Sequence, residues 1–200
     1  AVLASLWHTQ GPHLRRRRSG MATITLTSDH GYVMISAGLI AMEAIGMGAG
    51  VMGLRKKFFE SEEFKKSLRD SGIMEEHKKA FPEQPNGPLL GYPDMGSGRY
   101  AALLPYAQWV DFNNAQRAHY NMLEQVPSVL TLLLTASVRT PRAAAALGFE
   151  YFLARILYAK GYKGPKGAKG REVGAISGML GLMGLFLLTV HGGLKVAGAL

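Results

Sequence analysis

Apolar residues in this chain are gathered into four long runs instead of being spread at regular intervals. The runs cover residues 32–54, 112–138, 142–162 and 173–194. At about 1.5 Å per helical residue, each is long enough to cross a hydrocarbon core of roughly 30 Å. The first contains one charged residue, Glu43, and the last contains none, whereas the middle two are interrupted by ionisable residues. The pattern predicts an all-α integral membrane protein built as a four-transmembrane-helix bundle.

Basic residues outnumber acidic ones, 23 to 14, and the formal net charge is +9. They flank the apolar runs, as residues that set membrane topology do. No basic patch interleaved with aromatic residues is visible, which argues against nucleic-acid binding. Lysine and arginine are concentrated at the ends of loops 55–109 and 160–171. We therefore expect these two loops to share one side of the membrane, the cytosolic side.

The first twenty residues contain no acidic residue and carry four consecutive arginines, Arg15 to Arg18. This composition is typical of the end of a transit peptide or of a basic juxtamembrane anchor. The alternative is read-through ahead of Met21. We therefore divide the chain into an arginine-rich leader or disordered N-terminal extension, residues 1–20, and a single membrane domain, residues 21–200.

A long polar segment, residues 58–110, separates the first two runs. Ser61 suits the N-cap of a short interfacial helix, with Phe64 and Leu68 on one side and a Glu62–Lys66 pair on the other. Prolines farther along break regular structure. The Gly-Ser-Gly sequence after them follows no strand, so we interpret it as a turn and not as a phosphate-binding loop.

A polar stripe opens the second apolar run. On a helix Asn113, Arg117, Asn121 and Glu124 are spaced by four, four and three residues, so they share one face. Arg117 and Glu124 are about 10 Å apart along the axis, too far to pair directly. Two interpretations stay open: an interhelical ion-pair network that fixes packing, or a site for a zwitterionic ligand whose carboxylate binds the guanidinium and whose ammonium binds the glutamate.

A second stripe lies in the third run, because Tyr151, Arg155, Tyr158 and Tyr162 are spaced by four, three and four residues. An interfacial aromatic belt is the alternative for Tyr162, near the helix end. Arg155 lies deeper, where ionisable side chains mark a site. The chain contains no cysteine, so any thiol chemistry must use a bound thiol.

Small residues recur at spacings of three and four in the first and last runs, which favours close helix contacts in lipid. They are Gly46, Gly50, Gly53, Gly174, Gly178, Gly181 and Gly184. Between the second and third runs, Pro141 suits the first position of a helix after a tight turn.

The segment Arg117-Ala-His-Tyr-Asn121-Met-Leu-Glu124 resembles the R-x-x-x-N-x-x-E signature of the MAPEG family of membrane glutathione enzymes, and is most similar to its type 3 microsomal glutathione transferases. The likeness runs from Met21 to about Lys195, apart from the long polar segment. It implies a homotrimer that binds glutathione as co-substrate between protomers. The bound thiolate would attack a lipophilic electrophile or a lipid hydroperoxide. The histidines lack metal-ligand spacing, so we expect no metal.

The resemblance also implies the site residues. Those that bind glutathione are Arg55, Lys56, Arg117, Asn121, Glu124, Arg155, Tyr158 and Tyr162. The family's thiol-activating arginine, at the start of the fourth helix, matches Arg171, with Lys169 as the alternative because the linker length differs. The implied location is the endoplasmic reticulum or nuclear envelope, and the leader leaves a mitochondrial or plastid membrane open.

The sequence leaves two other functions open. One is a non-catalytic lipid-binding scaffold, because the family contains an activating protein for leukotriene synthesis that presents lipid without catalysis. The presence of Arg117, Glu124 and Arg171 argues against this function. A structural subunit of a larger membrane complex is the other, since the long polar segment and the leader would suit it. Gln125 stands where leukotriene-forming members carry tyrosine, so leukotriene synthesis is not implied.

Overall fold

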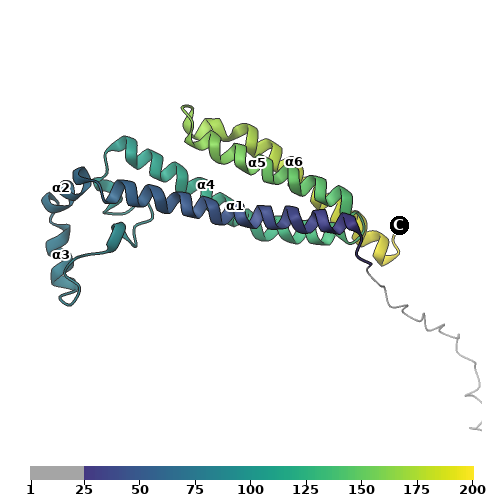
Figure 1. Cartoon of the computed structure of the whole chain (residues 1–200), viewed down its shortest axis with the longest axis horizontal. Helices are drawn as coiled ribbons and strands as arrows, with labels where there is room; N and C mark the ends of the chain where they lie inside the picture. Colours follow the sequence, from purple (N-terminus) through teal and green to yellow (C-terminus); the bar gives the residue numbers. More distant parts are fainter. Residues whose placement is uncertain (1–24) are drawn as a thin grey trace, which may run out of the picture.

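The computed structural model describes residues 25–200, which form helices joined by turns, without a strand in that part of the chain (Figure 1). The four long helices are α1 (Ser28–Phe59), α4 (Tyr106–Ser137), α5 (Pro141–Lys163) and α6 (Glu172–Ala197). The shorter elements are α2 (Glu62–Asp70), α3 (Ile73–Ala80) and the 3-10 helices η1 (Leu89–Gly91), η2 (Ala101–Leu103) and η3 (Gly167–Arg171). Each predicted apolar run coincides with one long helix, except that the second run extends one residue past the end of α4. The predicted leader, residues 1–20, lies outside the described residues.

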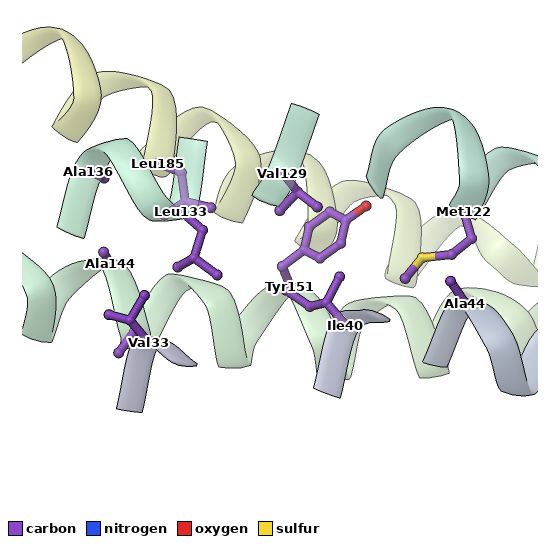
Figure 2. Close-up of a cluster of buried hydrophobic side chains, with 11 residues drawn as sticks. Val33, Ile40, Ala44, Met122, Val129, Leu133, Ala136, Ala144, Tyr151 and Leu185 are labelled. Carbon is purple, nitrogen blue, oxygen red and sulfur yellow. The ribbon is translucent and has the colours of Figure 1, made fainter. Parts of the chain in front are cut away.

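The long helices form one bundle, in which α1 runs beside α4 and α5 runs beside α6 (Figure 1). Its core is an apolar cluster to which all four contribute (Figure 2). Ile40, Leu133, Tyr151 and Leu185 come one from each helix, and all four are 0% exposed. Because lipid tails are as apolar as these side chains, the cluster stabilises the bundle in a membrane mainly through packing contacts.

Two helical stretches in the described chain are long and apolar enough to span a membrane, Ser28–Phe59 and Gly167–Ala197. Both leave large apolar side chains exposed on the outside of the bundle, such as Ile45 on α1 and Leu180 on α6. An outer surface of this kind suits lipid or another membrane helix better than water. The fold is thus that of an all-helical membrane protein.

The connections between long helices agree with the sequence. The tight turn between α4 and α5 is confirmed: the amide nitrogen of Thr140 donates to Ala136 O at 3.1 Å, and α5 begins at Pro141. A Cβ on Gly50, in the second half of α1, would lie 4.0 Å from Nζ of Lys163, at the end of α5. Loops 55–109 and 160–171 therefore leave the bundle at the same end, in agreement with their predicted common side.

Close helix packing is confirmed for the glycines of α6. A Cβ on Gly174 would overlap the backbone nitrogen of Tyr158 and lie 2.6 Å from Ala154 O. The same prediction is wrong for α1 within one protomer. Its Gly46 and Gly53 have no atom within 4 Å of an added Cβ, because this face of α1 points away from the other helices.

Residues 60–105 form a lobe at one end of α1 and α4 (Figure 1). The predicted N-cap is confirmed, since Ser61 Oγ accepts a hydrogen bond from the Phe64 amide at 3.2 Å. Phe64 is 2% exposed and packs edge-on against Phe59, with ring centroids 4.9 Å apart. The lobe thereby shares an apolar cluster with the ends of α1 and α4.

Two details of the lobe differ from the sequence prediction. The ion pair on α2 joins Glu62 to Lys65, at 2.8 Å, and not to Lys66, because residues three and four positions later both lie beside the glutamate on a helix. The helix α3 was not predicted. It begins at Ile73, and its N-cap is Gly72, which has a left-handed φ of 74° and no side chain, so the Ile73 amide donates instead to Ser71 Oγ at 3.2 Å.

The Gly-Ser-Gly sequence is a turn, as predicted, and one carboxylate, not foreseen from the sequence, organises it. Asp94 accepts hydrogen bonds from the amides of Gly96 (2.8 Å), Gly98 (3.0 Å) and Ala101 (2.7 Å). Asn113 of α4 in turn donates to Gly96 O at 2.7 Å. The first member of the polar stripe therefore attaches the lobe to the bundle.

Gly174→Ala should destabilise the protein, because the added methyl group overlaps the α5 backbone and overpacking of this kind costs typically about 1–3 kcal/mol. We expect a thermal unfolding temperature several degrees lower in detergent. Gly193→Ala in the same helix is the matched control, since an added Cβ there meets nothing within 4 Å. Equal unfolding temperatures for both variants would show that the α5–α6 contact is looser than described.

Candidate functional site

A pocket of about 330 Å³ opens between α4, the end of α5 and the start of α6. It is lined by Arg117, Tyr120, Asn121, Leu123, Glu124, Tyr158, Tyr162 and Arg171. The two stripes, predicted separately on two helices, thus meet the arginine that precedes α6. The volume falls within the roughly 300–1,000 Å³ of small-molecule sites.

The hairpin between α5 and α6 brings Arg171 to the pocket. Gly161 and Gly170 pack backbone to backbone, so closely that a Cβ on either would overlap the other residue. Arg171 Nη1 then donates to the hydroxyl of Tyr162, and its Cζ lies 5.1 Å from the ring centroid. Lys169 is exposed and does not line the pocket. The geometry therefore favours Arg171 over Lys169 as the cation of the site.

Arg155 lies behind this pocket, on an adjoining cavity of about 200 Å³. It is 2% exposed, its Nη1 donates to Asn121 Oδ1 at 2.9 Å, and its Cζ lies 4.1 Å from the centroid of the Tyr158 ring. Its Nε and Nη2 are buried without an acceptor in the described chain. Because buried donors are normally paired, these two nitrogens are available to acceptor oxygens of a ligand.

The wall of the pocket has an excess of positive charge. Arg117 and Glu124 are exposed to the opening, and neither forms an ion pair within residues 25–200, where both recorded ion pairs lie in the lobe. The ion-pair network considered above therefore does not engage these two side chains within one protomer. Around the pocket and the cavity behind it, three guanidinium groups, those of Arg117, Arg155 and Arg171, accompany the single carboxylate of Glu124.

The other two predicted site residues lie elsewhere. Arg55 is 1% exposed, donates from Nη1 to Leu90 O at 3.2 Å, and has its Cζ 4.3 Å from the Tyr92 ring centroid and 4.9 Å from that of Phe112. It is thus occupied by the lobe. Lys56 is exposed near the end of α1. The structure does not bring either residue to the pocket of the same protomer.

Tyr120 and Leu123 line the pocket but were not predicted to do so. Tyr120 lies three residues after Arg117, on the same helix face, so the spacing of the stripe was a usable signal. Leu123 resembles any apolar residue of the run and carries no such signal. Among the described residues, no three His, Asp or Glu side chains converge as metal ligands would.

Comparison with known proteins identifies the family to which the chain belongs. The model of the MAPEG family matches residues 33–191, which include every pocket residue. The chain is also similar to the uncharacterized protein sll1147 of Synechocystis sp., with 49% identity over 53 residues. That match covers 26% of this chain and 39% of the Synechocystis protein. The family match extends over most of the sequence, covering α4 and α5 completely and most of α1 and α6, so the chain belongs to the MAPEG family.

Proposed function

We propose that this protein is a glutathione transferase or glutathione peroxidase that spans the membrane four times and acts on lipophilic substrates. The observation that carries the proposal is the pocket itself, where six predicted residues from α4, α5 and η3 meet. Family membership supports a function in glutathione or lipid metabolism. The residues of the pocket support glutathione.

Charge and hydrogen-bonding chemistry favour this ligand. Glutathione carries two carboxylates, one ammonium group and one thiol, so its thiolate form has a net charge of about −2 at neutral pH. Three arginines and one glutamate around the two cavities complement that pattern. Arg117 suits a carboxylate in bidentate geometry, and Glu124 suits the ammonium group.

The bound thiolate would do the chemistry, since the chain has no cysteine of its own. With an electrophilic carbon, the sulfur forms a thioether and the leaving group departs with the electron pair. With a lipid hydroperoxide, the sulfur attacks the terminal oxygen and releases a lipid alcohol, and a second glutathione converts the sulfenic acid to disulfide and water. Arg171 would stabilise the thiolate.

The proposed assembly is a homotrimer in the membrane of the endoplasmic reticulum or nuclear envelope. The exposed glycine face of α1, with Gly46 and Gly53, supports close contact with a second copy, because such faces pack helix against helix in lipid. In that assembly Lys56 would be available to a neighbouring pocket. Arg55 would need to leave the lobe to reach one.

Arg117→Ala and Glu124→Ala should each weaken glutathione binding. Losing one charged contact typically costs about 2–5 kcal/mol, and we expect the low end, or roughly a 30-fold higher Kd, because both side chains are exposed. Isothermal titration calorimetry in detergent measures the change. Lys163→Ala, which removes an exposed cation outside the pocket, should bind like wild type. Unchanged affinity in both folded pocket variants would favour a structural function for the stripe.

Arg171→Ala should move a pKa more than it changes affinity. If the guanidinium lowers the glutathione thiol pKa by about two units from about 8.5, the thiolate fraction at pH 7 is roughly 75% instead of roughly 3%. The less basic thiolate is also about eightfold less nucleophilic, so the rate gain is only about threefold. In the variant, the pKa that governs thiolate absorbance should rise by a unit or more.

Lys169→Ala is the matched control for that measurement, because Lys169 is a nearby exposed cation that does not line the pocket. Its pH profile should coincide with that of the wild type. An unchanged pKa in Arg171→Ala would remove Arg171 from the mechanism.

A further inference from the structure

A chain of polar side chains lies behind the pocket and connects α5 to α4. The Tyr151 hydroxyl donates to Gln125 Oε1 at 2.9 Å, and Gln125 Nε2 donates to Asn121 Oδ1 at 3.5 Å. Arg155 Nη1 donates to the same Asn121 oxygen at 2.9 Å. Tyr151 is 0% and Arg155 2% exposed. Of these four residues, only Asn121 lines the 330 Å³ pocket.

The arginine determines the direction of every bond in this chain. A guanidinium can only donate hydrogen bonds, so the atom of Asn121 that faces Arg155 is the amide oxygen. That oxygen can only accept, so Gln125 must face it with its NH₂ group and turn its own oxygen toward Tyr151. The tyrosine hydroxyl must then donate. A reversed Asn121 amide would place donor against donor at Arg155.

The amide nitrogen of Asn121 is left to the pocket. It makes no hydrogen bond within residues 25–200 and is not one of the fully buried unpaired atoms there. It is therefore open to the cavity that Asn121 lines. An NH₂ group carries two donors and no acceptor, so this position can serve only an acceptor atom of a ligand.

We propose that Gln125 and Tyr151 are positioning residues that hold the Asn121 amide nitrogen toward the ligand, so that Asn121 binds a carboxylate or peptide carbonyl oxygen. The inference rests on the proposed function and specifies how its site binds the tripeptide. Glutathione offers acceptor oxygens at its carboxylates and at its two peptide carbonyls. Tyr151 lines neither cavity and Gln125 lines only the cavity behind the pocket, and both act on the ligand through Asn121.

A double-mutant cycle tests this dependence, with glutathione affinity measured by calorimetry on the detergent-solubilised chain. Gln125→Met should raise the Kd about threefold to tenfold, the value of one neutral hydrogen bond. In an Asn121→Ala chain the same substitution should cause no further loss, because the residue through which it acts is gone. Merely structural damage from Gln125→Met would lower affinity equally in both chains.

Tyr151→Phe provides a second variant if Gln125→Met does not fold, since it removes a single hydroxyl. It should give the same dependence on Asn121, whereas Tyr32→Phe, at an exposed tyrosine, should bind glutathione like wild type. Equal losses with and without Asn121, or no loss at all, would overturn the inference while the proposed function stands. A wild-type chain that fails to bind glutathione would overturn both.

Discussion

The burial of the Arg155 guanidinium is the constraint on which the site depends. Arginine keeps its charge inside a protein, and removing such an ion from water costs several kcal/mol unless its donors are paired. Asn121 supplies an acceptor and Tyr158 a ring face. The cation on α5 thereby joins α5 to α4, and it faces the cavity behind the pocket.

A second buried guanidinium, that of Arg55, is stabilised by different contacts. Arg55 lies against Tyr92 and Phe112 and donates to the backbone oxygen of Leu90. These partners come from the lobe and from α4, so the guanidinium joins the lobe to the bundle. Arg55 thus organises the lobe, whereas Arg155 organises the pocket. The lobe is therefore a packed part of the structure and not a solvated linker.

Much of the site could be predicted because it lies on regular helices. Arg117, Asn121 and Glu124 share a face by helical spacing alone, and Tyr158 and Tyr162 do so on α5. Helical spacing alone could not predict that these two faces line the same pocket; at the sequence level only the family resemblance indicated it. The glycine spacing of α6 likewise indicated its close packing. The same spacing on α1 could not show whether its glycines contact another helix of the protomer or lie on its outer surface.

The remaining features depend on contacts between distant residues. Nothing near Gln125 in sequence indicates that Tyr151, 26 residues later, donates to it. Arg55 precedes Leu90 by 35 residues, and the sequence pattern of a basic helix end is the same whether the arginine faces solvent, a ligand or the lobe. Helix α3 was missed because its N-cap is a glycine, and the serine that accepts from its first amide lies one residue earlier than a capping side chain normally does.

The central claim is that the pocket between α4, α5 and α6 binds glutathione as a thiolate. The most direct test is a titration of the detergent-solubilised wild-type chain with glutathione at pH 7, in which ultraviolet absorbance of the thiolate is followed. We expect saturable absorbance, with most of the bound thiol ionised. Absence of saturation, or bound thiol that ionises only near its free pKa of about 8.5, would contradict it.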